Sequence, residues 1–182
     1  MFDTNNNKSI FRMTTAEIIK EFGEPGDYSN FVTIVSPFPL KLDWDKTKTT
    51  VRITVHKKAA TSLSAILQEL LDVYGLDKIN ELGINEYAGC FNNRPKRGTE
   101  ERYKALMNAG QEARAKEYLS LHSWALAIDL DADRNKLHET KKTARFARSE
   151  YIDMIAIFYK HGWYSLGIEK DYDWMHMQYI KP

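Results

Sequence analysis

Two histidines of this chain stand close in sequence to a carboxylate, and the four residues together have the composition of a metal site. His122 precedes Asp129 by seven residues in SLHSWALAID, and Asp173 precedes His176 by three in DYDWMHMQY. Zinc is bound by neutral imidazole and carboxylate oxygen, and a catalytic zinc site keeps three protein ligands and one open position. His122, Asp129 and His176 would make such a set for one zinc ion.

A hydrolytic zinc site also needs a base that is not itself a ligand, because the attacking water must lose a proton. Asp173 suits that role. A histidine near a carboxylate is nevertheless more often a surface residue or a hydrogen-bonded core residue than a ligand, so the pairing alone does not assign a metal. Cys90 is the only cysteine, which excludes an internal disulfide and a cysteine-built zinc finger. It fits a small buried apolar residue better than the nucleophile of a Cys/His hydrolase.

The spacing of the first pair constrains its geometry. Residues seven apart on a regular strand face opposite sides, so His122 and Asp129 cannot both lie on one strand and bind one ion. Seven residues are close to two helical turns, which leaves a helix open as an alternative. The apolar run that ends in IDL favours a strand, and we therefore expect His122 on the turn before it.

The remaining elements must position these residues. A capping-box pattern, Thr14 followed by Glu17, predicts a short helix that stops at Gly23. Apolar residues at helical spacing predict a helix from Thr61 that stops at Gly75. We expect a further helix after Ser149 and strands at 31–42, 49–58, 124–131 and 173–180. The charged segment 99–118 is compatible with an exposed helix or with a mobile insertion.

These elements show no regular βαβ order, which predicts an α+β fold, a small antiparallel sheet flanked by helices. No repeat or linker divides the chain, so we expect one domain over residues 1–182. We expect residues 1–9 to be disordered and residues 10–60 to pack on the catalytic core as a helix and strands.

Charge and hydropathy exclude several kinds of partner. The 26 Lys and Arg residues balance 25 Asp and Glu residues, which leaves no overall field to hold a nucleic acid. No stretch approaches the roughly 18 apolar residues of a membrane span, and the N-terminus lacks the pattern of a secretory signal. We expect a monomer that is made in the cytoplasm and does not insert into membranes.

Two segments resemble the signatures of a known family. SLHSWALAID is similar to the S-x-H-x-x-G-x-A-x-D signature of the zinc peptidases that include D-alanyl-D-alanine dipeptidases, VanY-like carboxypeptidases and phage L-alanyl-D-glutamate endopeptidases. DWMH is similar to the second signature of that family. GCFNNRPKRG, at 89–98, resembles the stretch before the first signature in phage members, and the likeness spans about residues 20–180.

The resemblance implies roles for further residues. It implies that Arg94 polarises the scissile carbonyl, a role suited to a permanently charged guanidinium. Ser120 matches the first signature, and both hydrogen bonding to substrate and a structural turn role remain open. Two positions depart from the family pattern. Ala125 replaces a usual Gly, which costs little if the backbone there is not left-handed, and GWYSLG at 162–167 replaces a turn richer in Trp and Gly.

The fold implied is that of hedgehog proteins and D-Ala-D-Ala metallopeptidases. The function implied is zinc-dependent hydrolysis of an amide bond in the peptidoglycan stem peptide, as in a phage or prophage endolysin released to the cell wall by a separate pore-forming protein. A chromosomal carboxypeptidase of wall recycling would use the same residues. The alternative is an inactive wall-binding or structural module of the same fold.

Overall fold

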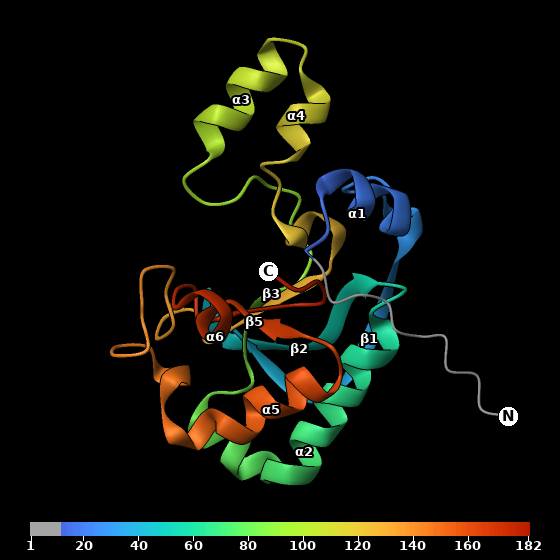
Figure 1. Cartoon of the computed structure of the whole chain (residues 1–182). Coiled ribbons are helices and arrows are strands. Elements are labelled where there is room, and N and C mark those ends of the chain that lie inside the picture. The colour runs from blue at the N-terminus through green and yellow to red at the C-terminus, as the bar shows by residue number, and fades with distance from the viewer. Residues whose placement is uncertain (1–11) are drawn as a thin grey trace, which may run out of the picture.

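The computed structural model describes residues 12–182, and its centre is a six-stranded sheet in the order β2-β1-β3-β4-β6-β5. Helices lie against this sheet, so the predicted α+β fold is confirmed (Figure 1). The sheet is mixed rather than wholly antiparallel, because β1 and β3 run parallel while the other pairs are antiparallel. The strands are β1 (Phe31–Leu42), β2 (Asp45–His56), β3 (Glu86–Gly89), β4 (Ala127–Leu130), β5 (Tyr164–Ser165) and β6 (His176–Gln178).

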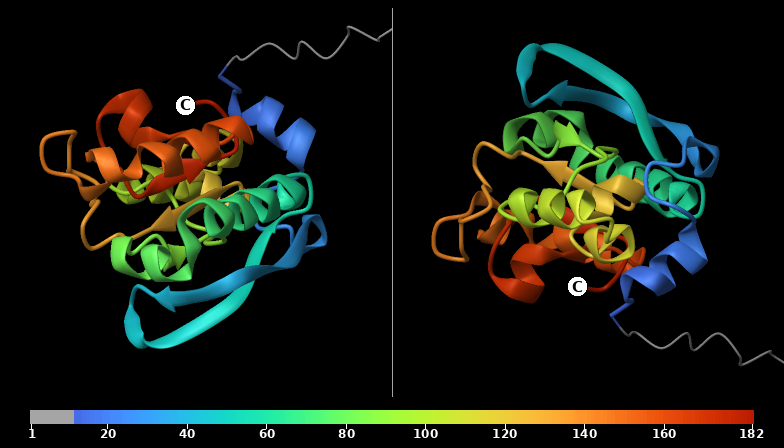
Figure 2. Two further views of the ribbon diagram at one scale, coloured as in Figure 1. Left: turned by 90° about the horizontal axis from the view of Figure 1, so that it is seen from below. Right: turned by 90° about the horizontal axis from the view of Figure 1, so that it is seen from above.

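The N-terminal elements follow the sequence prediction closely. Helix α1 (Thr15–Phe22) begins at the predicted capping box, in which Thr14 and Glu17 exchange hydrogen bonds, and ends at Gly23. A short 3₁₀ helix, η1 (Tyr28–Asn30), leads into the β1–β2 hairpin, which extends along one side of the molecule in Figure 2. The prediction for residues 1–9 lies outside the described residues.

The predicted stop at Gly75 is confirmed as a break in the helical conformation, but a second helical segment follows it that was not predicted. Helix α2 (Ala60–Leu82) joins the two segments across a kink at Gly75, whose φ of 69° and ψ of 161° are not helical, and Gly83 caps its end. Ile79 and Leu82, which lie beyond the kink, are both buried. Their packing stabilises this second helical segment, which is too short to form on its own.

Segment 99–118 forms two short helices, α3 (Glu100–Asn108) and α4 (Glu112–Lys116), which extend away from the sheet in Figure 1. A β-bridge between Pro95 and Leu119 closes the base of this helical hairpin. Of the two readings of the sequence, the structure shows helix, in two pieces.

The C-terminal half contains elements that the sequence did not reveal. The predicted helix after Ser149 is confirmed as α5 (Ile152–Lys160), but strands β3 and β5 and helix α6 (Leu166–Lys170) were not predicted. The short 3₁₀ helices here are η2 (Leu121–Trp124), η3 (Arg145–Ala147) and η4 (Ser149–Tyr151). Strands of two to four residues are too short to carry a periodic signal.

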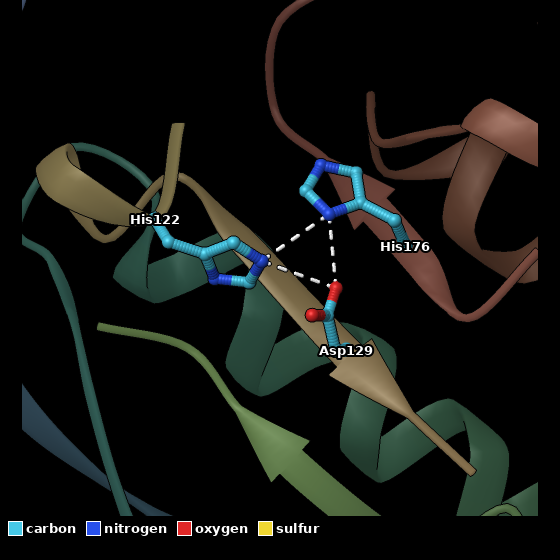
Figure 3. A group of neighbouring side chains, drawn as sticks. All are labelled: His122, Asp129 and His176. Carbon is cyan, nitrogen blue, oxygen red and sulfur yellow. Dashed lines mark hydrogen bonds and ion pairs between the residues drawn. The ribbon is translucent and has the colours of Figure 1, made fainter. Parts of the chain in front are cut away.

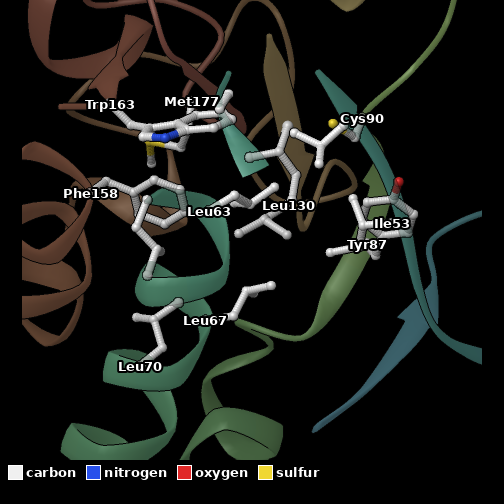
Figure 4. Close-up of a cluster of buried hydrophobic side chains, with 14 of the residues drawn as sticks. Ile53, Leu63, Leu67, Leu70, Tyr87, Cys90, Leu130, Phe158, Trp163 and Met177 are labelled. Carbon is white, nitrogen blue, oxygen red and sulfur yellow. The ribbon is translucent and has the colours of Figure 1, made fainter. Parts of the chain in front are cut away.

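The main hydrophobic core lies between the sheet and helices α2 and α5. Figure 4 shows Leu63, Leu67 and Leu70 of α2 on one side and Leu130 of β4 and Met177 of β6 on the other. Because β4 is buried along its whole length, its ends are held rigidly. Among the described residues no helix is long and apolar enough to cross a membrane.

Candidate metal centre and active-site cleft

His122 lies on the turn that precedes β4, as its spacing from Asp129 predicted. The turn is η2, and Ser120 is its N-cap, whose Oγ accepts a hydrogen bond from the backbone N–H of His122 at 3.4 Å. Ala125 ends the turn in the left-handed conformation, after which β4 begins at Ala127. The chain therefore reverses sharply between His122 and Asp129, which brings both side chains to the same side.

Strand pairing brings His176 to the same point. Asp129 of β4 and His176 of β6 are direct partners in an antiparallel ladder, so their side chains lie on one face of the sheet. Asp129 Oδ1 lies 3.1 Å from His122 Nε2 and 2.9 Å from His176 Nδ1, and the two nitrogens are 3.2 Å apart (Figure 3). All three side chains are buried.

This arrangement fits a metal ion. Four donors placed tetrahedrally about zinc, at its usual bond lengths, are separated by about 3.3 Å, and the three separations in this structure are close to that value. Burial alone would raise the pKa of Asp129, but the two imidazoles hold it well below its usual range. Burial would lower the pKa of His176, but Asp129 raises it. The group therefore favours a positive charge between its members, and it could bind a metal ion.

The ring nitrogen of His122 that points away from the donor group, Nδ1, also has a hydrogen-bond partner. His122 Nδ1 lies 2.7 Å from the carbonyl oxygen of Cys90. A carbonyl oxygen only accepts, so the proton of the neutral imidazole sits on Nδ1, which leaves the lone pair of Nε2 directed at Asp129 and His176. The Cys90 thiol is buried and burial raises its pKa, as expected for a small apolar residue rather than a nucleophile.

Asp173 lies beside this group with an unusual environment. Its backbone is left-handed, with φ 52°, and its carbonyl oxygen accepts a hydrogen bond from the backbone N–H of His176 at 3.0 Å. Its Oδ1 is buried and has no hydrogen-bond partner among residues 12–182. Burial raises the pKa of this carboxyl. Backbone strain and an unpaired buried oxygen are costly features that concentrate at functional sites.

Arg94 and Ser120 lie in the same cleft. The Arg94 guanidinium donates from one Nη to the carbonyl of Pro95 at 3.0 Å, and burial together with the nearby Arg97 lowers its pKa. The carbonyl of Arg94 accepts from the backbone N–H of Ser120, which ties the two segments together. The structure thus shows a turn role for Ser120, whose side chain also lines the cleft.

The cleft has a volume of about 600 Å³ and a basic lining. Asp173, His176 and Ser120 all contribute to its walls, and Asp173 is the only acidic residue among the described residues that line it. Its basic lining residues are Arg12, Arg94, Lys96, Arg97, Lys170 and Lys181. A concave site lined by one sign of charge attracts ligands of the opposite sign, here anions.

The structure explains how Ala125 is tolerated where the resembling family usually has Gly. Its φ of 51° is left-handed, a conformation that costs a residue with a Cβ about 1–2 kcal/mol. Its methyl group is fully buried, which returns about 0.8 kcal/mol.

Ala125→Gly should therefore change the free energy of unfolding by less than about 1 kcal/mol. Ala125→Val should lower it by more than about 2 kcal/mol, because a β-branched side chain is strained there. Urea denaturation of the two variants measures both effects, and a large loss of stability in Ala125→Gly would contradict this account.

Gly167 is a residue whose importance sequence reasoning missed. It lies in α6, and a Cβ at this position would come within 2.5 Å of Trp174 Cε3, inside van der Waals contact. We expect Gly167→Ala to lower the free energy of unfolding by about 1–3 kcal/mol and to displace the segment that carries Asp173. Ile168→Ala, at an exposed position of the same helix, is the matched control and should cost much less. Because alanine favours a helix more than glycine does, helix propensity alone would make Gly167→Ala stabilising, and an unchanged or increased stability would contradict the contact with Trp174.

Comparison with known proteins agrees with this geometry. Residues 113–179 match the family described as D-alanyl-D-alanine carboxypeptidase, and the matched stretch contains the three donor residues together with Ser120 and Asp173. The fold, the donor group and this match together indicate a metallopeptidase. The match covers less than half of the chain, and it supports the family suggested by the sequence resemblance. Arg94 lies outside the matched stretch. No curated protein matches the chain.

Proposed function

We propose that this protein is a zinc-dependent peptidoglycan hydrolase that cuts an amide bond in the stem peptide. The observation that carries the proposal is the buried group of His122, Asp129 and His176, whose donor atoms converge beside a basic cleft. The bond would be either L-Ala–D-Glu, cut by an endopeptidase of the phage or prophage endolysin type, or D-Ala–D-Ala, cut by a carboxypeptidase. Both substrates carry carboxylates, which suit the basic lining of the cleft.

The three donors would hold the ion through His122 Nε2, His176 Nδ1 and Asp129 Oδ1. Zinc, when bound, supplies a Lewis acid that polarises a carbonyl and lowers the pKa of water. Asp173 would take the proton of the attacking water on its unpaired Oδ1 and pass it to the leaving amine. The raised pKa of this carboxyl makes it a better proton acceptor than an ordinary aspartate. Arg94 would stabilise the negative charge that develops on the carbonyl oxygen.

Ser120 would support the site in two ways. Its Oγ fixes the turn that carries His122, and its position in the cleft wall allows a hydrogen bond to the substrate backbone. The proposed catalytic arrangement thus uses residues from β4, β6, the turn before β4, the loop before β6 that contains Asp173 and the loop that contains Arg94.

The decisive experiment combines metal analysis with product analysis. The purified protein should contain about one zinc ion per chain, reduce the turbidity of permeabilised Gram-negative cells and cleave defined muropeptides. Mass spectrometry then identifies the bond, because a carboxypeptidase releases free D-alanine whereas the endopeptidase creates a new amino terminus on D-glutamate. The same protein stripped by a chelator is the control and should regain activity when zinc returns. A zinc-loaded protein that cleaves neither substrate would support the alternative, an inactive wall-binding module.

A further inference from the structure

Gln178 is a buried polar residue whose side chain contacts both His176 of the donor group and the backbone of Ile180. It lies two residues after His176 on β6, so both side chains project from the same face of that strand. Its exposed fraction is 7%, and its side chain borders the cleft. Gln178 Oε1 lies 3.1 Å from His176 Nε2, and Gln178 Nε2 donates to the carbonyl oxygen of Ile180 at 2.5 Å.

The contact with Ile180 fixes which end of the amide faces the histidine. A backbone carbonyl oxygen can only accept a hydrogen bond, so the amide atom beside it must be the NH₂ group. The reversed amide would place two acceptor oxygens against each other at 2.5 Å. The oxygen of Gln178 therefore faces His176.

That orientation in turn fixes the proton of His176. Because Gln178 Oε1 is an acceptor, the imidazole must carry a hydrogen on Nε2 to make the contact at 3.1 Å. In the neutral ring the lone pair is then on Nδ1, the atom that lies 2.9 Å from Asp129 Oδ1 and 3.2 Å from His122 Nε2. The Gln178 amide therefore favours the neutral tautomer of His176 in which the lone pair of Nδ1 points toward Asp129 and His122.

His122 thus presents Nε2 to the donor group and His176 presents Nδ1. In each ring the other nitrogen donates a hydrogen bond to an acceptor, which fixes the tautomer. The acceptor of His122 is the backbone carbonyl of Cys90, which no side-chain substitution removes. The acceptor of His176 is a side chain. His176 is therefore the ligand whose tautomer can be tested directly by mutation.

We propose that Gln178 is a positioning residue that locks His176 in the Nε2-protonated tautomer and so presents Nδ1 to the metal. The inference rests on the proposed zinc site and adds to it a residue that is not one of the three metal donors. Outer hydrogen-bond partners of metal-binding histidines fix ring orientation and raise ligand basicity, and their loss costs about 10–100-fold in metal affinity.

Two substitutions of Gln178 by side chains of similar size distinguish the effect of its hydrogen-bond acceptor from the effect of its packing. Gln178→Met fills the same space without an acceptor for His176. Gln178→Glu keeps an oxygen that accepts from His176 Nε2 but places its other oxygen against the carbonyl of Ile180, a repulsion that thermal unfolding without metal records. Gln68→Met, on the exposed face of α2, is the control for the substitution itself. Each protein is measured by competition with a chromophoric zinc chelator, by thermal unfolding without metal, and by ¹⁵N NMR of the histidine rings at a pH where they are neutral.

We expect Gln178→Met to bind zinc about 10–100-fold more weakly than the unmodified protein and to lose the single Nε2-protonated signal of His176. Gln178→Glu should lose thermal stability through its repulsion from the Ile180 carbonyl, but it should keep that signal and bind zinc more tightly than Gln178→Met, since a carboxylate also orients a metal-binding histidine. The inference is overturned if Gln178→Met keeps both its zinc affinity and the His176 tautomer, or if both variants lose affinity only in proportion to their loss of thermal stability. An unmodified protein that binds no zinc would instead refute the proposed function, and the NMR tautomer would still test Gln178.

Discussion

Replacement of His176 with alanine should yield a folded protein that neither retains zinc nor hydrolyses muropeptides. The substitution removes one of three donors and leaves the buried carboxylate of Asp129 with one imidazole instead of two. The expected loss of zinc affinity exceeds the roughly 10–100-fold that follows from losing an outer-shell partner, because a direct ligand is gone. Zinc content after gel filtration and the rate of muropeptide cleavage measure the two effects. The same result is expected for His122→Ala and Asp129→Ala.

His138→Ala is the matched control for this experiment. His138 does not belong to the buried donor group, and its replacement should leave both zinc content and turnover unchanged. Full hydrolysis of cell walls by the His176→Ala protein would show that the group is not the catalytic metal centre.

Asp173→Asn should separate metal binding from turnover. The proposed ligands are untouched, so we expect zinc to remain at about one ion per chain. Loss of a general base typically reduces turnover by about 10²–10⁴-fold, and the amide of asparagine cannot accept the proton. Asparagine is the better replacement because it tolerates the left-handed backbone at this position, whereas alanine would add strain. Zinc analysis and kcat on a defined muropeptide are the measurements.

Asp171→Asn is the matched control for the same substitution at another left-handed position of the loop before β6. Asp171 is also left-handed, with φ 54°, but its carboxylate accepts from the backbone N–H of Lys141 and does not line the cleft. Its replacement should leave kcat near that of the unmodified protein. If Asp173→Asn lost its zinc, the assignment of ligands and base would have to be revised.

The parts of the fold that were predictable are those whose signals are local. The capping box at Thr14 and Glu17 specifies a helix start by two side-chain hydrogen bonds, and the structure contains both. Gly75 likewise marks the break in α2, where the backbone is not helical. The second helical segment after it was not predictable in this way, because it depends on the burial of Ile79 and Leu82 against the rest of the protein. The parallel pairing of β1 and β3 depends on chain packing and leaves no trace in either strand.

In the candidate site, too, some residues could be predicted from local sequence signals and others could not. His122, Asp129, Asp173 and His176 could be chosen from residue type and spacing, and the structure brings them together. The contact of the Cys90 carbonyl could not be predicted, because it depends on the path of a loop 32 residues before His122. Gln178 lies only two residues from His176 and from Ile180, but its residue type alone does not show that the amide is buried between them. Gly167 was missed because its requirement comes from Trp174, which only the tertiary structure places against it.

The place of β6 in the sheet bears on the order in which this protein folds. It is the last strand, yet it lies between β4 and β5 rather than at an edge. Asp129 and His176 are 47 residues apart in the chain, so their pairing closes a long loop, which is a slow step. A chain that has formed β1 to β4 holds two of the three donors and has no complete binding group. We therefore expect zinc to enter only after β6 has inserted, so that the ion stabilises the finished sheet without guiding the earlier steps of folding.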